Sequence, residues 1–154
     1  MSTFKAVDQH SGSLSGSLTT GRILKAGLIS IVAAAFANLG ARLVLVPLAS
    51  QNTGFPPFGL PQIILFTIIG TFLGVLVFLA IRRISKNPIR TYTIVAIIAL
   101  AVSILPNLAA MANPSVMAFP FGDPGTSLDF GLLIVFHVIA AFVHLGVFIS
   151  MLRR

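Results

Sequence analysis

The sequence contains no cysteine among its 154 residues. This absence excludes disulfide bonds, thiolate metal sites and thiol-based redox or nucleophilic chemistry. Charged residues are also scarce, since they make up 8% of the chain, whereas an ordinary soluble domain carries about 25%. Water solvates such an uncharged surface poorly. The composition therefore excludes an ordinary soluble domain and indicates a chain embedded in lipid.

Acidic residues are the scarcest charged group, with three in the whole chain. They are Asp8, Asp123 and Asp129, and none falls inside a long apolar run. A proton or sodium pump usually carries a carboxylate within the membrane, so the sequence disfavours a pump. Serine-nucleophile motifs, phosphate-binding loops and the HExxH metal motif are missing as well. We therefore predict a protein that is not an enzyme.

Two histidines, His137 and His144, lie seven residues apart in the last apolar run. This spacing is about 10.5 Å along one helix, so the two rings cannot bind opposite faces of one haem. Two histidines without nearby carboxylates or thiolates also fall short of the three or four ligands of a metal site. We expect neither a metal nor another cofactor.

Four apolar runs are present, at about residues 26–48, 61–81, 91–111 and 130–151. Each holds about 20 residues, which is enough for an α-helix to cross a hydrocarbon core of about 30 Å. Residues 1–21 are rich in Ser, Thr and Gly without apolar periodicity, which predicts a disordered polar tail. The predicted fold is an all-α membrane protein in which residues 22–154 form a bundle of four antiparallel transmembrane helices.

The basic residues predict the orientation of these helices. Nine of the ten lie in the tail region up to Lys25, in residues 82–90 or at the C-terminus, which is one side of the membrane if the chain crosses four times. The other side carries Asp123 and Asp129 but no Lys or Arg. Cytoplasmic loops are enriched in Lys and Arg, so both termini are predicted to be cytoplasmic, in the cell (cytoplasmic) membrane. The net charge of +7 is then an orientation signal, and we expect no nucleic-acid partner.

The two loops predicted on the outer side are rich in proline, glycine and phenylalanine, with FPPFG at 55–59 and FPFGDPG at 119–125. Proline and glycine favour turns. Tryptophan is absent and Tyr92 is the single tyrosine, so phenylalanines such as Phe55 and Phe58 are expected to anchor the interface. The alternative is that these loops fold over the bundle and cap a ligand site.

Arg42 is the single basic residue inside a predicted span. Arg at a helix centre costs about 2.5–3.5 kcal/mol on insertion scales, so this side chain must reach the surface or find acceptors in the bundle. Counting about 1.5 Å per residue places polar side chains of all four spans at similar depths in the outer part of the bilayer. We hypothesise that they form a ligand-binding cluster centred on Arg42 and His137, with Asp129 as the only acid within reach. The members of this polar layer are Arg42, Asn38, Thr67, Thr71, Ser103, Asn107 and His137. A hydrogen-bonded layer that orients the helices without a ligand is the alternative.

Two further features stand outside this layer. Gly70 and Gly74 form a GxxxG motif in the second span, a spacing that permits close helix packing with a partner or a second copy. His144 lies about 20 Å below the outer boundary, apart from the other polar groups. We regard it as a possible functional histidine.

Several short pieces of the sequence resemble one family. They are Arg90 with Thr91 and Thr93, Ser103 with Pro106, and His144 with Leu145 ahead of the basic C-terminus, together with ANLGARLVLV in the first span. Across roughly residues 24–154 the chain resembles a bacterial family of uncharacterised four-span integral membrane proteins, known as a domain of unknown function. The resemblance implies a four-helix membrane protein and no particular activity, and it gives added weight to His144.

Two functions are expected from these observations. The first is a non-enzymatic accessory or structural component of a membrane complex, whose partners are the lipid bilayer and either a second copy or another membrane protein. The alternative is a small-solute or anion transporter, or a ligand-binding protein, that uses the polar layer as a pocket.

Overall fold

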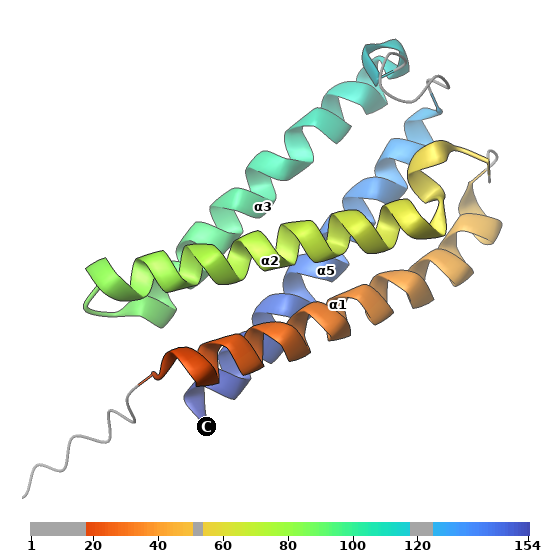
Figure 1. Cartoon of the computed structure of the whole chain (residues 1–154). Coiled ribbons are helices and arrows are strands. Elements are labelled where there is room, and N and C mark those ends of the chain that lie inside the picture. Colours follow the sequence, from red (N-terminus) through yellow and green to blue (C-terminus); the bar gives the residue numbers. More distant parts are fainter. Residues whose placement is uncertain (1–17, 51–53, 118–124) are drawn as a thin grey trace, which may run out of the picture.

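The computed structural model describes residues 18–50, 54–117 and 125–154, which contain helices and connections but no β-strand. Four long helices make up most of this chain: α1 (Thr20–Ala49), α2 (Leu60–Ile84), α3 (Pro88–Ala112) and α5 (Ser127–Arg153). Two short 3-10 helices are also present, η1 (Pro56–Phe58) before α2 and η2 (Pro114–Met117) after α3. The prediction of an all-α fold with four long helices is confirmed (Figure 1).

Each long helix is apolar and long enough to cross a membrane. The two shortest have 25 residues and therefore extend over about 37 Å, more than a hydrocarbon core of about 30 Å. Large apolar side chains such as Phe36 and Phe142 point outwards, with 69% and 68% of their surface exposed. Polar side chains such as Ser30, Asn38 and Thr71 are buried. Apolar outside and polar inside is the pattern of a multi-pass membrane protein.

Every long helix extends beyond the span predicted for it. The largest extension is at the start of α1, which begins at Thr20. Thr19 caps this helix, because its side chain accepts a hydrogen bond from the backbone N–H of Arg22. The assignment of Thr20 and Gly21 to a disordered tail is therefore wrong. Residues 1–17 of the predicted tail lie outside the described residues.

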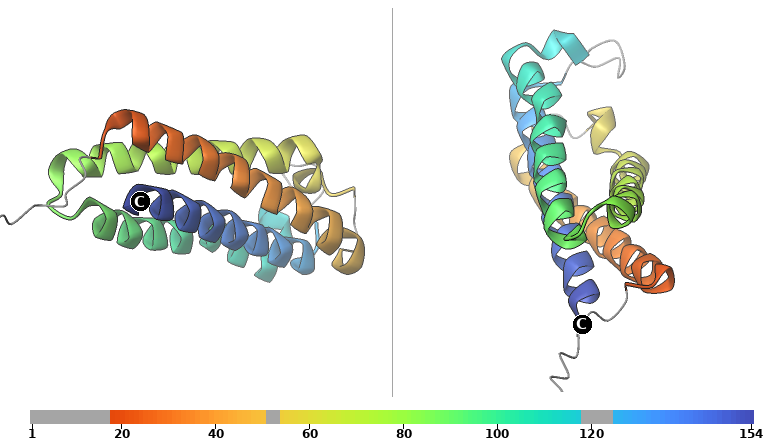
Figure 2. Two further views of the ribbon diagram at one scale, coloured as in Figure 1. Left: turned by 90° about the horizontal axis from the view of Figure 1, so that it is seen from below. Right: turned by 90° about the vertical axis from the view of Figure 1, so that its left-hand side faces the viewer.

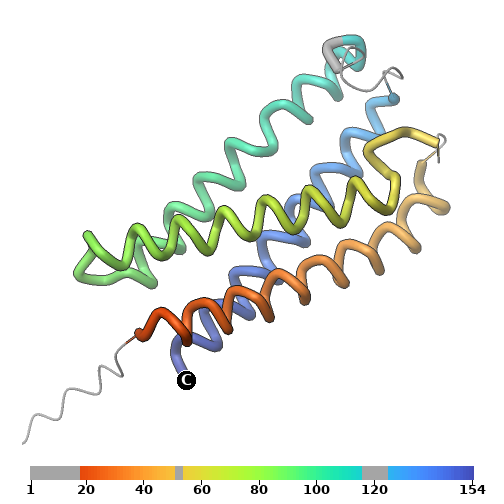
Figure 3. The backbone as a smooth tube through the Cα atoms, in the orientation of Figure 1, coloured from red at the N-terminus to blue at the C-terminus, as the bar shows by residue number. Residues whose placement is uncertain are grey.

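The ends of the long helices gather at two ends of the molecule (Figures 1 and 3). One is the basic end, where α1 and α3 begin and α2 and α5 finish; there Arg22 Nη2 donates to the carbonyl oxygen of Met151 at 3.4 Å. The other is the phenylalanine end, where Ser50 Oγ, just after α1, donates to Asp129 Oδ1 in α5 at 2.6 Å. These two hydrogen bonds join α1 to α5 at both ends of the molecule.

The helices are not evenly spaced. α1 packs along both α2 and α5, and α3 packs along α5. α2 and α3 meet at their short connection, residues 85–87, and diverge toward the phenylalanine end (Figures 1 and 2). The phenylalanine end therefore needs packing from another part of the chain.

Two buried apolar clusters hold the helices together. The basic-end cluster comes from the four long helices alone: Ile23, Ala26, Val75, Phe78, Ile81, Tyr92, Phe148 and Leu152. The phenylalanine-end cluster also contains side chains of the connection between α1 and α2: Val46, Phe55, Phe58, Ile63, Ala110, Phe130, Leu132 and Phe136.

The expectation that Phe55 and Phe58 anchor the membrane interface is wrong, because they are 1% and 0% exposed. The ring of Phe55 stands edge-on to that of Phe130, with centroids 5.5 Å apart, and the ring of Phe58 stands edge-on to that of Phe136 at 6.2 Å. The prolines that begin η1 turn the chain so that both rings face α5. Residues 119–124 of the other loop lie outside the described residues.

Candidate functional site

Within the described residues, Asn38 and Thr67 are the members of the predicted polar layer whose side chains bond to each other across two helices. Asn38 Nδ2 in α1 donates to Thr67 Oγ1 in α2 at 2.9 Å, and both residues are buried. The second polar atom of the amide, Asn38 Oδ1, is buried without a hydrogen-bond partner in the described chain. A buried acceptor without a donor carries a desolvation cost, and this oxygen keeps the capacity to accept a hydrogen bond.

Arg42 bonds to the connection at the phenylalanine end. Its Nε donates to the carbonyl oxygen of Phe58 at 2.8 Å, and the residue is half-buried. A long arginine side chain can reach a polar acceptor in this way while its methylene groups stay against apolar surface.

Asp129 does not pair with Arg42, contrary to expectation, and the described residues contain no ion pair between them. Its Oδ1 accepts from Ser50, and its Oδ2 accepts from the backbone N–H of Thr126 at 2.8 Å and from the Thr126 hydroxyl at 2.8 Å. In return, Thr126 Oγ1 accepts from the backbone N–H of Asp129, which completes a capping box at the start of α5. The carboxylate is thus occupied in starting a helix.

The four remaining members of the polar layer donate to carbonyl oxygens of their own helices. The bonds are Thr71 Oγ1 to Thr67 (2.6 Å), Ser103 Oγ to Leu100 (2.8 Å), Asn107 Nδ2 to Ser103 (3.5 Å) and His137 Nδ1 to Leu133 (2.8 Å). A carbonyl three or four residues earlier is always within reach in a helix, so a lone polar side chain in an apolar surrounding bonds to it. The expected centre of Arg42 and His137 is therefore not joined by hydrogen bonds, because each has a separate local partner.

His144 was expected to stand apart from other polar groups, and this expectation is wrong. Its Nε2 lies 3.0 Å from the hydroxyl oxygen of Tyr92, so a hydrogen bond joins α5 to α3. Both residues are buried, at 5% and 2% exposure. The imidazole also stacks on the ring of Phe148, with centroids 5.4 Å apart and an interplanar angle of 12°. Its Nδ1 is buried without a partner in the described chain.

Gly74 of α2 lies directly beside this pair. A Cβ at this position would lie 3.0 Å from Tyr92 Oη and 3.2 Å from His144 Nε2. Glycine therefore allows α2 to approach the side-chain pair, and we call Gly74, Tyr92 and His144 the three-helix site. Gly70 is exposed, and a Cβ there would meet nothing within 4 Å. Within the chain, then, Gly74 alone of the GxxxG pair approaches a neighbour, while packing of a partner on Gly70 stays a prediction.

Tyr92 is the residue of this site that the sequence analysis missed. It is the single tyrosine of the chain, and it falls near the start of the third predicted span, at about residues 91–111. Tyr92 lies in the second turn of α3, which begins at Pro88, and its hydroxyl reaches His144. One signal was available, since the family-like residues Arg90, Thr91 and Thr93 surround it.

The described residues contain no group of three or more His, Cys, Asp or Glu side chains that could hold a metal ion. The three-helix site offers one imidazole, one phenol and no carboxylate. It can therefore form hydrogen bonds between helices, but it lacks the donor set of a metal centre.

A protein-family model described as a family of unknown function (DUF6069) matches residues 15–154. The chain belongs to this family. The match confirms the resemblance to an uncharacterised family, includes all four long helices and extends into the predicted polar tail. No curated protein and no solved structure matches the chain. Membership of DUF6069 assigns no activity, and the four long apolar helices support a membrane protein.

Proposed function

We propose that this protein is a non-enzymatic accessory or structural component of a membrane complex. The observation that carries the proposal is the local use of its buried and half-buried polar groups. Thr71, Ser103, Asn107 and His137 donate to their own helices, and Arg42 donates to the connection before α2. Each of these side chains thus bonds to a separate backbone carbonyl, so they are not joined to one another around a common centre.

We further propose that the four helices are antiparallel in a bacterial cytoplasmic membrane, with both termini in the cytoplasm. The contact between Arg22 and Met151 supports this arrangement, because it brings the start of α1 beside the finish of α5. The basic residues at the same end support the orientation.

The absence of cysteine makes this orientation directly testable. A single Lys86→Cys variant is expected to react with a membrane-impermeant maleimide only after the membrane is opened. A Gly54→Cys variant, exposed at the phenylalanine end, is expected to react in intact cells. The opposite labelling pattern would reverse the proposed orientation.

The accessory role predicts a partner on the exposed apolar surface, and Gly70 is the position where another helix can approach most closely. A photoreactive amino acid at position 70 is expected to give a discrete cross-linked product in native membranes. The same probe at Phe142, which is exposed on α5, serves as the control for random collisions. The accessory role fails if the protein purifies as a lone monomer and the probe at position 70 gives no product above the background at position 142.

Binding of a small polar solute is the second candidate, supported by the unpartnered Asn38 Oδ1. A solute that donates a hydrogen bond would satisfy this oxygen. In that case Asn38→Leu should abolish solute binding or flux in proteoliposomes, while Ser103→Ala, which loses only a bond within α3, should retain it. Equal activity of the two variants would exclude Asn38 as the binding residue.

A further inference from the structure

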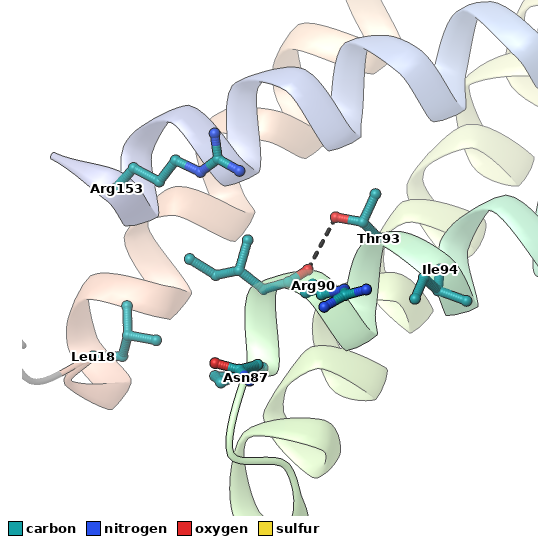
Figure 4. Close-up of a pocket in the computed structure, with 8 residues that line it drawn as sticks. Leu18, Asn87, Arg90, Thr93, Ile94 and Arg153 are labelled. Atoms are coloured by element: carbon teal, nitrogen blue, oxygen red, sulfur yellow. Dashed lines mark hydrogen bonds between the residues drawn. The ribbon is translucent and has the colours of Figure 1, made fainter.

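A pocket opens at the basic end, where α3 begins and α5 finishes (Figure 4). Its walls come from three parts of the chain: Leu18 ahead of α1, the first turns of α3, and Arg153 of α5. Arg90 and Arg153 contribute two positive charges from two different helices. This pocket contains no member of the polar layer or of the three-helix site.

These two arginines lack a partner in the described part of the chain. Both side chains are exposed, and neither forms a hydrogen bond or ion pair with a described residue. Arg22 and Arg82, at the same end, instead donate to oxygen atoms of the chain. Asp129, the one acidic residue in the described ranges, lies at the phenylalanine end. The pocket therefore holds two positive charges that no described anion neutralises.

Asn87 adds a neutral donor to the pocket. It precedes α3, and its side chain forms no capping hydrogen bond. The hydroxyl of Thr93 is already used, because it donates to the carbonyl oxygen of Ile89 at 2.9 Å (dashed line in Figure 4). Two guanidinium groups and an amide are the donors that bind a phosphate group well, since arginine can offer two parallel N–H donors to its oxygens.

The pocket also has an apolar side. Leu18 and Ile94 line it, and Ile94 is 50% exposed. Ile97 and Ile98, three and four residues further along α3, are exposed too, so they continue the same helix face. A free phosphate ion gains nothing from an apolar wall. A phospholipid carries its phosphate next to acyl chains, which would lie along this helix face.

We propose that this pocket binds the phosphodiester headgroup of an anionic phospholipid, with Arg90 and Arg153 contacting the phosphate and Ile94 contacting the acyl chains. Basic pockets between membrane helices on the cytoplasmic side recognise anionic headgroups in this way. The inference goes beyond the accessory role and does not depend on it, because a lone monomer would bind the lipid at the same place.

The test uses the full-length protein in neutral detergent micelles, titrated with phosphatidylglycerol, phosphatidylcholine or inorganic phosphate, with bound lipid counted by native mass spectrometry. The wild type is expected to retain phosphatidylglycerol in preference to phosphatidylcholine. The double variant Arg90→Gln/Arg153→Gln is expected to lose roughly tenfold or more in affinity for phosphatidylglycerol, because two charge-assisted contacts are removed.

Arg83→Gln/Lys86→Gln is the matched control. It removes two exposed charges from the same end but no residue that lines the pocket, so its affinity should stay close to that of the wild type. Equal losses in the two double variants would show general attraction to a basic surface and overturn the site. Inorganic phosphate that competes as well as phosphatidylglycerol would assign the pocket to a soluble anion and overturn the lipid proposal.

A second variant keeps the proposal testable if the glutamine variant fails to fold. Arg90→Lys/Arg153→Lys preserves both charges but loses the planar, two-pronged donor geometry of arginine. Its affinity for phosphatidylglycerol is expected to fall between those of the wild type and the glutamine variant. Wild-type affinity in this lysine variant would show that the guanidinium groups are not required.

Discussion

The two ends of the helix bundle are closed in different ways. At the basic end, side chains of the long helices meet directly, and the ring of Phe78 stands edge-on to those of Tyr92 and Phe148, with centroids 5.3 and 5.1 Å apart. At the phenylalanine end, α3 has diverged from α2 and adds Ala110 to the buried cluster, while the connection adds Phe55 and Phe58. Where membrane helices separate, a connecting segment can thus supply the packing that a neighbouring helix supplies elsewhere.

The polar groups differ between the two ends as well. In the three-helix site, a side-chain hydrogen bond joins α3 to α5 and depends on the small size of Gly74 in α2. At the phenylalanine end, the carboxylate of Asp129 holds the first turn of α5 and the residue that follows α1. The first arrangement specifies how helices approach each other, and the second specifies where a helix begins.

Among these substitutions, Phe78→Ala is expected to cause the largest loss in the free energy of unfolding. Removing a fully buried aromatic ring leaves a cavity and costs about 3–5 kcal/mol in protein interiors, and three-helix packing leaves little freedom for collapse. Phe58→Ala should cost less, because the short η1 can shift to fill the space. The measurement is the free energy of unfolding in mixed micelles. Phe72→Ala, at a half-exposed position of α2, is the control. A larger loss in Phe58→Ala would reverse the comparison of the two ends.

Gly74→Val is expected to cause the second largest loss of stability. The new side chain would overlap Tyr92 Oη and His144 Nε2, and overpacking typically costs about 1–3 kcal/mol. Gly70→Val places the same side chain on the same helix in open space, so the monomer should keep its stability. Thermal unfolding of both variants in detergent gives the comparison. Similar losses at positions 70 and 74 would mean that helix propensity, and not contact with the three-helix site, determines the effect.

At the phenylalanine end, Asp129→Ala is expected to cause a smaller loss of stability. It removes the capping box and the acceptor of Ser50, and loss of a helix cap costs about 0.5–2 kcal/mol. Amide hydrogen exchange is expected to accelerate in the first turn of α5 and to stay unchanged near Tyr92. Ser127→Ala, which removes one exposed hydrogen bond to Met111, is the control. Uniform acceleration along α5 would contradict a local capping role.

The sequence was sufficient to predict the four helices, because a membrane requires long apolar segments with their backbone groups bonded internally. It was insufficient for the partners of the polar side chains. Counting residues estimates the depth of Arg42 and His137, but it does not give the rotation of each helix or the local carbonyl that each side chain reaches. Tyr92 was missed because its role depends on contact with two other helices.

The smallest loss of stability is expected from Tyr92→Phe, which removes only the hydroxyl that bonds to His144. Hydrogen bonds between membrane helices contribute about 0.6 kcal/mol on average, so a double-mutant cycle of Tyr92→Phe with His144→Leu should give a coupling free energy of that order. A second cycle, combining Thr93→Val with His144→Leu, is the control, because Thr93 bonds within α3 and should show no coupling. A coupling near zero in the first cycle would mean that the apolar packing of Phe78, Tyr92 and Phe148 joins the helices at the basic end without help from the hydrogen bond.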